Sequence, residues 1–395
     1  MDALSKLLDL PDEEKAERGL RYTPREIAQQ PTLWASTFHL FRRRLTEFEE
    51  FFQSAGMDLN IGKRPTVLLI GAGTSDYIGK SLVALLRQQW QCDVIALPST
   101  DLLTHLDQEL IPEKNYLCIS FSRSGESPEG VSVLERTLNL RPDIYHLVVS
   151  CNAAGRMAAA IEGKENALAF ILEDAVNDRG LAMTSSFSSM VILGQCLAYF
   201  KSIHRYEDVL AALVAAGKSF LGIAADCAAE LASGSYTQAC FVGSGPLRAV
   251  AQESALKLLE MTAGKVQTMS ESALGLRHGP MAALNEATLF VSFLSSDERV
   301  RKYETDLLEE IGKKRLVRSR IVVTSDSMPD SRSFAEYHLV PGISVSIPDE
   351  YRPPVDILFG QLLGLFFSLR SNLKPDCPSP NGAISRVVGN ISVYP

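Results

Sequence analysis

A short serine-rich segment has residue types and spacing that could bind an anion. Residues 122–127 read SRSGES, and Pro128 follows at what would be the first position of a helix. Ser122, Ser124 and Ser127 supply hydroxyl donors, and a helix N-terminus adds N–H groups that favour a phosphate. An ordinary strand-to-helix turn rich in small residues would give the same pattern. The segment therefore favours a phosphate loop and leaves the plain turn open.

Two further groups could carry acid–base chemistry. Glu253, Lys257 and Glu260 have the i, i+4, i+7 spacing that places them on one stripe of a helix. His278 stands before a Gly-Pro pair, where a constrained backbone would fix its position. A solvated Glu–Lys stripe and a structural hydrogen bond are the commoner explanations of these two patterns. No second His or Cys lies at metal-ligand spacing, which argues against a metal site.

The elements that must position these residues alternate between strands and helices. Runs rich in β-branched and apolar residues occur at 66–70, 93–97, 115–121, 144–150 and 167–172. Helical segments separate most of them. This alternation predicts a parallel sheet with helices on both faces, an α/β fold.

The strand pattern occurs twice. Residues 67–73 (VLLIGAG) align with 239–245 (ACFVGSG), and the same offset aligns 119–121 with 291–293. We infer two copies of one α/β unit. The second copy has LSSDE at 294–298, where the glycine of the serine-rich loop is lost and acid is gained. We therefore expect a single phosphate site, in the first copy.

These patterns divide the chain into four parts. We expect a helical leader at 1–50, a phosphate-binding domain at 51–215, a second domain with the Glu–Lys helix and the histidine loop at 216–372, and a tail at 373–395.

The segment GAGTS at 71–75 resembles part of a dinucleotide fingerprint. The next glycine, Gly79, comes too late for GxGxxG, and the following strand ends in Pro98 rather than in an acidic ribose ligand. A sugar that lies on this loop and hydrogen-bonds Thr74 and Ser75 fits better than a nicotinamide cofactor.

Composition narrows the partners. The chain has 395 residues, 46% of them hydrophobic, and a net charge of −8, which argues against nucleic acid and anionic membranes. The seven cysteines form no CxxC pair, so buried thiols in a reducing compartment are the simplest account. No signal peptide is evident and no apolar run approaches the length of a membrane span. We expect a cytoplasmic protein.

Taken together, the motifs resemble the SIS (sugar isomerase) family over residues 50–390. The loop at 122–127 resembles its SxSGxT/S phosphate loop. Residues 253–260 resemble the EGALKLKE helix of glucosamine-6-phosphate synthase, 277–280 its KHGP loop, and 381–388 the tail that closes its active site.

A closer resemblance is to the AgaS-type galactosamine-6-phosphate deaminase/isomerases. It rests on DRGLAMTSS at 178–186, EMTAGK at 260–265, RVV at 386–388 and the helical leader. The resemblance implies two tandem SIS domains, each a flavodoxin-like three-layer sandwich with a parallel sheet flanked by helices. It also implies a homodimer with a shared active site, and neither a cofactor nor a metal.

The resemblance also implies roles for single residues. Glu260 would move a proton between C1 and C2 of the sugar, His278 of a neighbouring subunit would open the ring, and Lys257 would be an active-site lysine. The tail lysine of the synthase has no clear counterpart, and Arg386 is the nearest residue. The residues expected to bind substrate or phosphate are Gly73, Thr74, Ser75, Ser122, Arg123, Ser124, Ser127, Thr184 and Arg386.

The expected reaction converts D-galactosamine-6-phosphate to D-tagatose-6-phosphate and ammonia. The same residues would serve an aldose–ketose isomerase of neutral sugar phosphates, a glucosamine-6-phosphate deaminase, or amino-sugar synthesis from free ammonia. A sugar-phosphate sensor would need the phosphate loop without Glu260 or His278. The sequence does not fix the C4 epimer.

Overall fold

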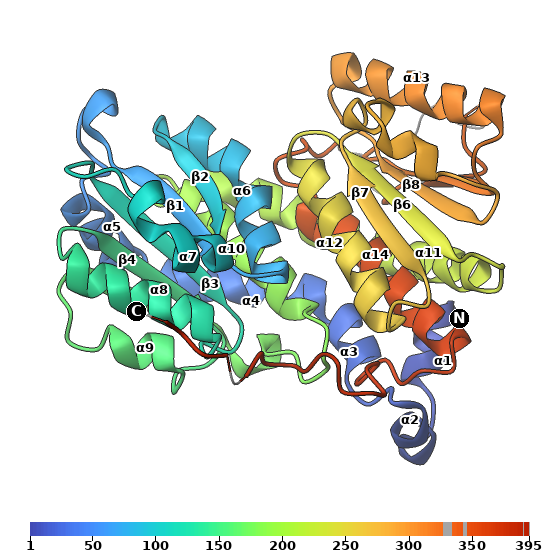
Figure 1. The fold of residues 1–395 in the computed structure, drawn as a ribbon, viewed down its shortest axis with the longest axis horizontal. Coiled ribbons are helices and arrows are strands. Elements are labelled where there is room, and N and C mark those ends of the chain that lie inside the picture. The colour runs from blue at the N-terminus through green and yellow to red at the C-terminus, as the bar shows by residue number, and fades with distance from the viewer. Residues whose placement is uncertain (327–333, 343–345, 390, 395) are drawn as a thin grey trace. The chain divides into compact units, whose positions relative to one another are not determined.

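The chain forms two compact units, each built around one five-stranded sheet (Figure 1). The computed structural model describes residues 1–395 except 327–333, 343–345, 390 and 395. The first-sheet unit comprises Leu33–Asn177, Ser185–Glu207 and Ile384–Pro395. The second-sheet unit comprises Met1–Thr32, Asp178–Thr184 and Asp208–Ala383.

The first sheet is parallel throughout and has the strand order β2-β1-β3-β4-β5. Its strands are β1 (Thr66–Gly71), β2 (Val94–Pro98), β3 (Tyr116–Ser122), β4 (Tyr145–Ser150) and β5 (Ala167–Ile171). Strands β1 and β3 are buried along their whole length, as expected of apolar strands covered on both faces. All five strands expected from the sequence are confirmed.

Helices cover both faces of this sheet. The helices that lie in this unit are α5 (Leu45–Ser54), α6 (Thr74–Trp90), α7 (Ser99–Glu109), α8 (Pro128–Leu140), α9 (Arg156–Ala160) and α10 (Ser185–Ala198). On one face, α7 and α8 pack against each other over a cluster that includes Leu68 and Ile70. On the other face, α6 packs on β1 and against α10. This is the expected three-layer sandwich.

The second sheet has the order β10-β9-β8-β6-β7 and is also parallel. Its strands are β6 (Gln238–Gly243), β7 (Gln267–Glu271), β8 (Thr288–Phe293), β9 (Ser319–Val323) and β10 (Tyr337–Leu339). Followed from β7 to β10, the order is that of the first sheet, with β6 in the place of β1. The predicted duplication is therefore confirmed in topology.

The duplication extends to backbone conformation. Gly73 and Gly245 precede α6 and α12, and both have φ of 56°. A Cβ on Gly71 would lie 2.7 Å from the backbone N of Asp76, and one on Gly243 would lie 2.6 Å from the carbonyl carbon of Leu247. In both copies, a glycine allows the helix to begin directly against the strand.

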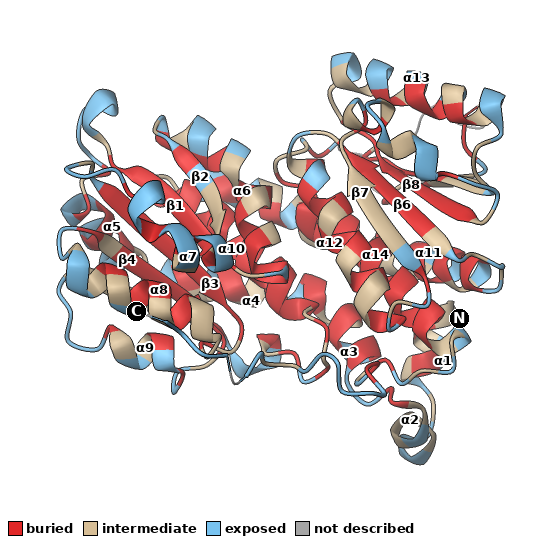
Figure 2. Ribbon diagram, viewed as in Figure 1, coloured by how far each residue is buried: buried red, intermediate tan, exposed pale blue. Residues whose placement is uncertain are grey.

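The second-sheet unit contains one buried helix, α14 (Pro353–Arg370), which packs against α12 and α3. The others are α1 (Ala3–Leu8), α2 (Asp12–Arg18), α3 (Thr23–Ala28), α12 (Pro246–Met261) and α13 (Glu298–Lys314). All residues of α14 from Pro353 to Ser368 are buried (Figure 2). Helix α12 packs between α14 and strands β6 and β7.

The compact units differ in extent from the ranges expected from the sequence. Residues 1–50 are helical, but Met1–Thr32 belongs to the second-sheet unit. There α3 packs on α14, and Gln30 Nε2 lies 2.6 Å from Gln361 Oε1. The end of the chain, from Ile384, belongs to the first-sheet unit. Two helices, α4 (Gln30–Arg43) and α11 (His204–Ala232), contain a boundary between units.

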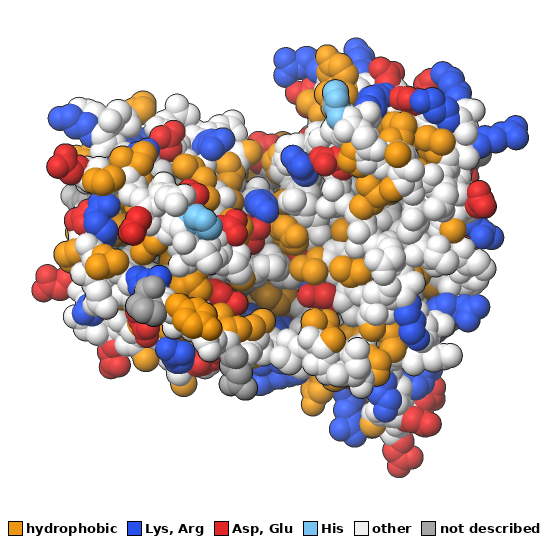
Figure 3. Space-filling model, viewed as in Figure 1, with side chains coloured by type: hydrophobic (Ala, Val, Ile, Leu, Met, Phe, Trp, Pro, Cys, Tyr) orange, Lys and Arg blue, Asp and Glu red, His pale blue; other side chains and the backbone are white. Residues whose placement is uncertain are grey.

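Helix α11 contradicts the expectation that no apolar run approaches the length of a membrane span. It has 29 residues, and its most apolar window has a mean hydropathy of 1.6. Within it, Leu213 and Phe220 are completely buried. Core helices of soluble proteins reach the same length and hydropathy, so one such helix is weak evidence for a membrane span. On the face drawn in Figure 3, acidic and basic side chains are interspersed.

Candidate active site

The serine-rich loop lies at the carboxyl end of β3 and leads into α8. Ser122 Oγ accepts a hydrogen bond from the N–H of Gly125 at 3.0 Å, and Ser124 Oγ accepts one from the N–H of Glu126 at 3.2 Å. Because each hydroxyl accepts in these contacts, its own proton can still be donated to an anion. Gly125 has φ of 64°, a conformation that favours glycine.

Ser127 occupies the predicted N-cap position of α8, and Pro128 is in the first turn. Its side chain makes no capping hydrogen bond, and in the described part of the chain its hydroxyl has no hydrogen-bond partner. The hydroxyl of Ser127 therefore lies at a helix N-terminus and does not cap the helix. This arrangement suits an anion ligand.

A second loop ends the neighbouring strand. Gly73 precedes α6, and Thr74 and Ser75 begin that helix after β1. Since β1 and β3 are parallel neighbours, both loops lie at the same edge of the sheet. The chain leaves β1 for β2 on one side and reaches β3 on the other, so this edge is the switch point at which α/β sheets bind ligands.

Arg123 and Arg386 join the tail to the serine-rich loop. The buried Arg123 donates from Nη2 to the carbonyl O of Arg386 at 2.5 Å. Arg386 in turn donates from Nη2 to Asn177 Oδ1 at 2.5 Å. The structure thus places the segment around Arg386 against the serine-rich loop.

Thr184 has a structural environment. It is completely buried, its Oγ1 donates to Asp178 Oδ1 at 2.8 Å, and its N–H donates to Asp178 Oδ2 at 2.9 Å. Thr184 belongs to the second-sheet unit, whereas the residues of the two loops belong to the first-sheet unit. These contacts favour a structural role over the expected substrate contact.

In the second-sheet unit, Glu253, Lys257 and Glu260 lie on α12 with the predicted spacing. Lys257 Nζ lies 3.3 Å from Glu253 Oε1 and 2.7 Å from Glu260 Oε2. The side chains of Glu253 and Lys257 are 0% and 1% exposed, whereas that of Glu260 is 24% exposed. The solvated Glu–Lys stripe is therefore ruled out for the first two residues. Glu260 is the member of this triad that solvent or a substrate can reach.

Charge pairing keeps Lys257 protonated in the interior. Burial acts to lower the pKa of Lys257, but the negative charges of Glu253 and Glu260 outweigh it and raise this pKa. The ammonium of Lys257 fixes the side chain of Glu260 by a hydrogen bond of 2.7 Å. An oriented and partly exposed carboxylate has the position that an acid–base group needs.

Two glycines of α14 allow α12 to take this position. A Cβ on Gly360 would lie 2.7 Å from Ser254 Cβ, and one on Gly364 would lie 3.1 Å from the carbonyl O of Lys257. Neither glycine was predicted from the sequence as part of the site. Their small-xxx-small spacing, GxxxG, was the available signal.

His278 lies between two short 3-10 helices, η3 (Gly275–Arg277) and η4 (Pro280–Ala283). It is exposed, and within the described residues its imidazole makes no hydrogen bond. The structural hydrogen bond considered for it is therefore absent there. The next residue, Gly279, has φ of 123°, which only glycine adopts readily, so the turn after His278 requires glycine.

Two parallel sheets of one repeated topology, with a serine-rich loop at the switch point of the first, define the tandem SIS class of phosphosugar isomerase folds. A solved Escherichia coli structure described as tagatose-6-phosphate ketose/aldose isomerase matches with a TM-score of 0.84 and 29% identity, over 94% of this chain and 96% of that one. The C-terminal domain of Francisella tularensis glucosamine-fructose-6-phosphate aminotransferase, at 18% identity and a TM-score of 0.71, shares the fold.

Within this class, the chain belongs to the AgaS family. It is 35% identical to the AgaS protein of Streptomyces coelicolor over 94% of this chain and 95% of that protein. It is 32% identical to the D-galactosamine-6-phosphate deaminase AgaS of Escherichia coli, over 95% and 96% of the two chains. No family model matches the chain.

Proposed function

We propose that this protein converts D-galactosamine-6-phosphate and water to D-tagatose-6-phosphate and ammonia. The observation that carries the proposal is the α12 triad, in which a buried Lys257 orients the accessible carboxylate of Glu260. The name of the Escherichia coli AgaS relative gives the substrate class.

The proposal assigns the phosphate to the serine-rich loop, through the hydroxyls of Ser122, Ser124 and Ser127. His278 promotes opening of the sugar ring. Glu260 removes the proton from C2 of the open-chain amino aldehyde and returns it to C1, while the C2 amine loses one proton and the C1 oxygen gains one, which gives a C2 imine and a C1 alcohol. Water adds to the imine carbon and ammonia leaves, which gives the ketose. A carboxylate suits this 1,2-proton transfer because it can act as base and then as acid.

The proton-transfer role is tested with Glu260→Gln, assayed for ammonia release from D-galactosamine-6-phosphate. We expect kcat to fall on the order of 10²–10⁴-fold with little change in KM. Glu309→Gln is the matched control, because Glu309 lies on α13 and pairs only with Lys313 among the described contacts. Near-normal ammonia release by Glu260→Gln would sink the proposal.

An aldose–ketose isomerase of neutral sugar phosphates is the second candidate, favoured by the description of the Escherichia coli structure. Galactosamine-, glucosamine-, galactose- and glucose-6-phosphate separate the candidates when ammonia and ketose are measured together. Ketose from the neutral sugars, without ammonia from the amino sugars, would favour the isomerase.

We further propose a homodimer in the cytoplasm, with His278 supplied to the partner's site. The exposed imidazole supports this assignment. Mixing equal amounts of inactive His278→Ala and Glu260→Gln chains should restore roughly a quarter of the wild-type activity. About half of the dimers are then mixed, and each mixed dimer has one intact site of its two. If both residues act within one chain, no activity returns.

A further inference from the structure

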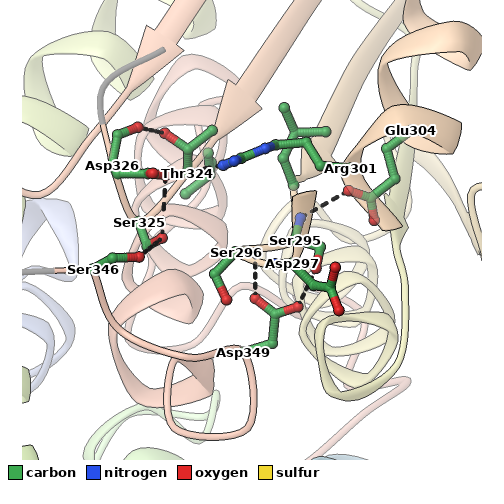
Figure 4. A network of polar contacts seen from close by, with 12 residues as sticks. Ser295, Ser296, Asp297, Arg301, Glu304, Thr324, Ser325, Asp326, Ser346 and Asp349 are labelled. Atoms are coloured by element: carbon green, nitrogen blue, oxygen red, sulfur yellow. Dashed lines mark hydrogen bonds and ion pairs between the residues drawn. The ribbon is translucent and has the colours of Figure 1, made fainter. Parts of the chain in front are cut away.

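The loop after β8 is the second copy's counterpart of the serine-rich loop, and a carboxylate occupies it. The N–H of Ser296 donates to Asp349 Oδ1 at 2.7 Å, and Ser295 Oγ donates to Asp349 Oδ2 at 2.5 Å (Figure 4). The N–H of Ser295 donates to Glu304 Oε2 at 2.7 Å. Backbone N–H and serine O–H groups before a helix are the donors by which the first copy is expected to hold phosphate.

Asp349 reaches this loop from the segment that precedes α14. Its two oxygens are each held by a donor of the loop, as the oxygens of a bound oxyanion would be. Its side chain is 16% exposed, so the position communicates with solvent. The loop after β8 has thus lost the glycine of the serine-rich loop, and the carboxylate of Asp349, from another part of the chain, is bound there instead.

A buried cation stands beside the carboxylate. Arg352 Nη1 lies 3.2 Å from Asp349 Oδ1 and donates to the carbonyl O of Leu294 at 2.6 Å. Arg352 Nη2 lies 2.8 Å from Asp356 Oδ2. If the carboxylate of Asp349 were removed, the guanidinium, the N–H of Ser296 and the hydroxyl of Ser295 would remain around the vacated volume.

We propose that the loop after β8 is a second oxyanion-binding position whose resident ligand is the carboxylate of Asp349. Shortening this side chain creates a site for a small oxyanion, either a carboxylate such as acetate or inorganic phosphate. Asp349 and Arg352 also fix the start of α14, on which α12 packs, so the position supports the helix of Lys257.

The test uses the full-length Asp349→Ala chain, melted in chloride and in increasing acetate or phosphate at constant ionic strength. We expect its Tm to lie below that of the wild type in chloride and to recover at least half of the loss, saturably, with either anion. The matched control is Asp326→Ala, which removes a carboxylate of the neighbouring network that pairs with Arg301 at 3.1 Å. Its Tm should not recover.

An equal effect of the anions on the wild type and both variants would overturn the proposal, because it would be a general salt effect. Absence of recovery in Asp349→Ala would overturn it also. If this variant is too unstable to purify, the yield of refolded Asp349→Ala in acetate against chloride gives the same comparison. Asp349→Asn keeps an oxygen near the N–H of Ser296 and fills the volume, so it should show no saturable recovery.

The result is independent of the proposed function. Repeating the titration with Ser124→Ala and Ser127→Ala added removes hydroxyls of the first loop. Recovery that persists in this background assigns the anion to the loop after β8. Recovery that disappears would place the anion at the first loop and refute the inference without touching the catalytic assignment.

Discussion

Replacing Gly360 by alanine should displace the helix that carries Lys257 and Glu260. The added Cβ would lie 2.7 Å from Ser254 Cβ and 2.9 Å from Ser254 Cα. The second contact is with a backbone atom, so rotating a side chain cannot relieve it. Helices α12 and α14 must therefore move apart, although α12 is also packed on β6 and β7.

The size of the effect follows from two opposing terms. Alanine is favoured over glycine inside a helix by about 1 kcal/mol. Overpacking of a well-filled interior costs about 1–3 kcal/mol, and contacts this short belong at the upper end. The net loss of stability is then about 2 kcal/mol, which for a unit of this size lowers Tm by roughly 4–8 °C.

The assay is a thermal melt with ammonia release measured in parallel. Gly222→Ala on α11 is the matched control, because its Cβ would come no closer than 3.5 Å to Asp2 and should leave Tm equal or slightly higher. In Gly360→Ala, kcat should fall roughly tenfold to a hundredfold, since misplacing a catalytic group by about 1 Å can cost that much. A Gly360→Ala chain as stable and as active as Gly222→Ala would refute the reasoning.

Three further changes test other parts of the structure. Burial first, and then the charge of Asp178, raises the pKa of Glu26 to about 8. The stability linked to this proton is present below the ordinary pKa of 4.5 and is lost as pH rises through about 8, so Tm should fall less in Glu26→Gln than in wild type between about pH 6 and pH 9. Equal slopes would contradict this. Asp376 accepts N–H bonds from Arg21, Tyr22 and Thr23 at the start of α3, so Asp376→Asn should lose about 1 kcal/mol in urea unfolding, while the exposed Asp12→Asn should not. Ser127→Ala should raise KM roughly tenfold and leave Tm unchanged, because its hydroxyl has no partner among the described residues; an unchanged KM would remove Ser127 from the phosphate site.

The sequence predicted the fold well where its pattern is local. Five apolar strand runs were sufficient to place the first sheet, and the repeated strand–Gly–x–Gly motif placed β6 of the second, because a βα turn of this kind needs glycine at Gly71 and Gly73. Strands β7 and β10 were not predicted. The serine-rich loop and the N-cap position of Ser127 were predicted for the same reason.

Contacts between distant parts of the chain were not predictable in this way. The spacing of Glu253, Lys257 and Glu260 fits a solvated stripe as well as a buried triad, and only the packing of α14 over α12 decides between them. From the sequence, the loss of glycine in the loop after β8 indicated only that this loop does not bind phosphate. The carboxylate that binds there, Asp349, is distant in sequence from Ser295, so its role could not be predicted. Thr184 was predicted to contact the substrate because it lies in the motif at 178–186. Its hydrogen-bond partner, Asp178, lies in the same motif, but the sequence did not indicate that the two side chains bind each other.

The packing of the first helices on α14 has a consequence for how the protein is made. Helix α3 ends at Ala28 and packs on a helix that begins at Pro353. At about 5–20 residues per second, a ribosome exposes α3 on the order of tens of seconds before its partner exists. Ile27, which lies on α3 and is buried in the finished protein, remains without that partner during this interval. The first sheet can form while synthesis continues, whereas the second-sheet unit must wait for nearly the whole chain, so chaperone dependence should centre on the nascent N-terminus.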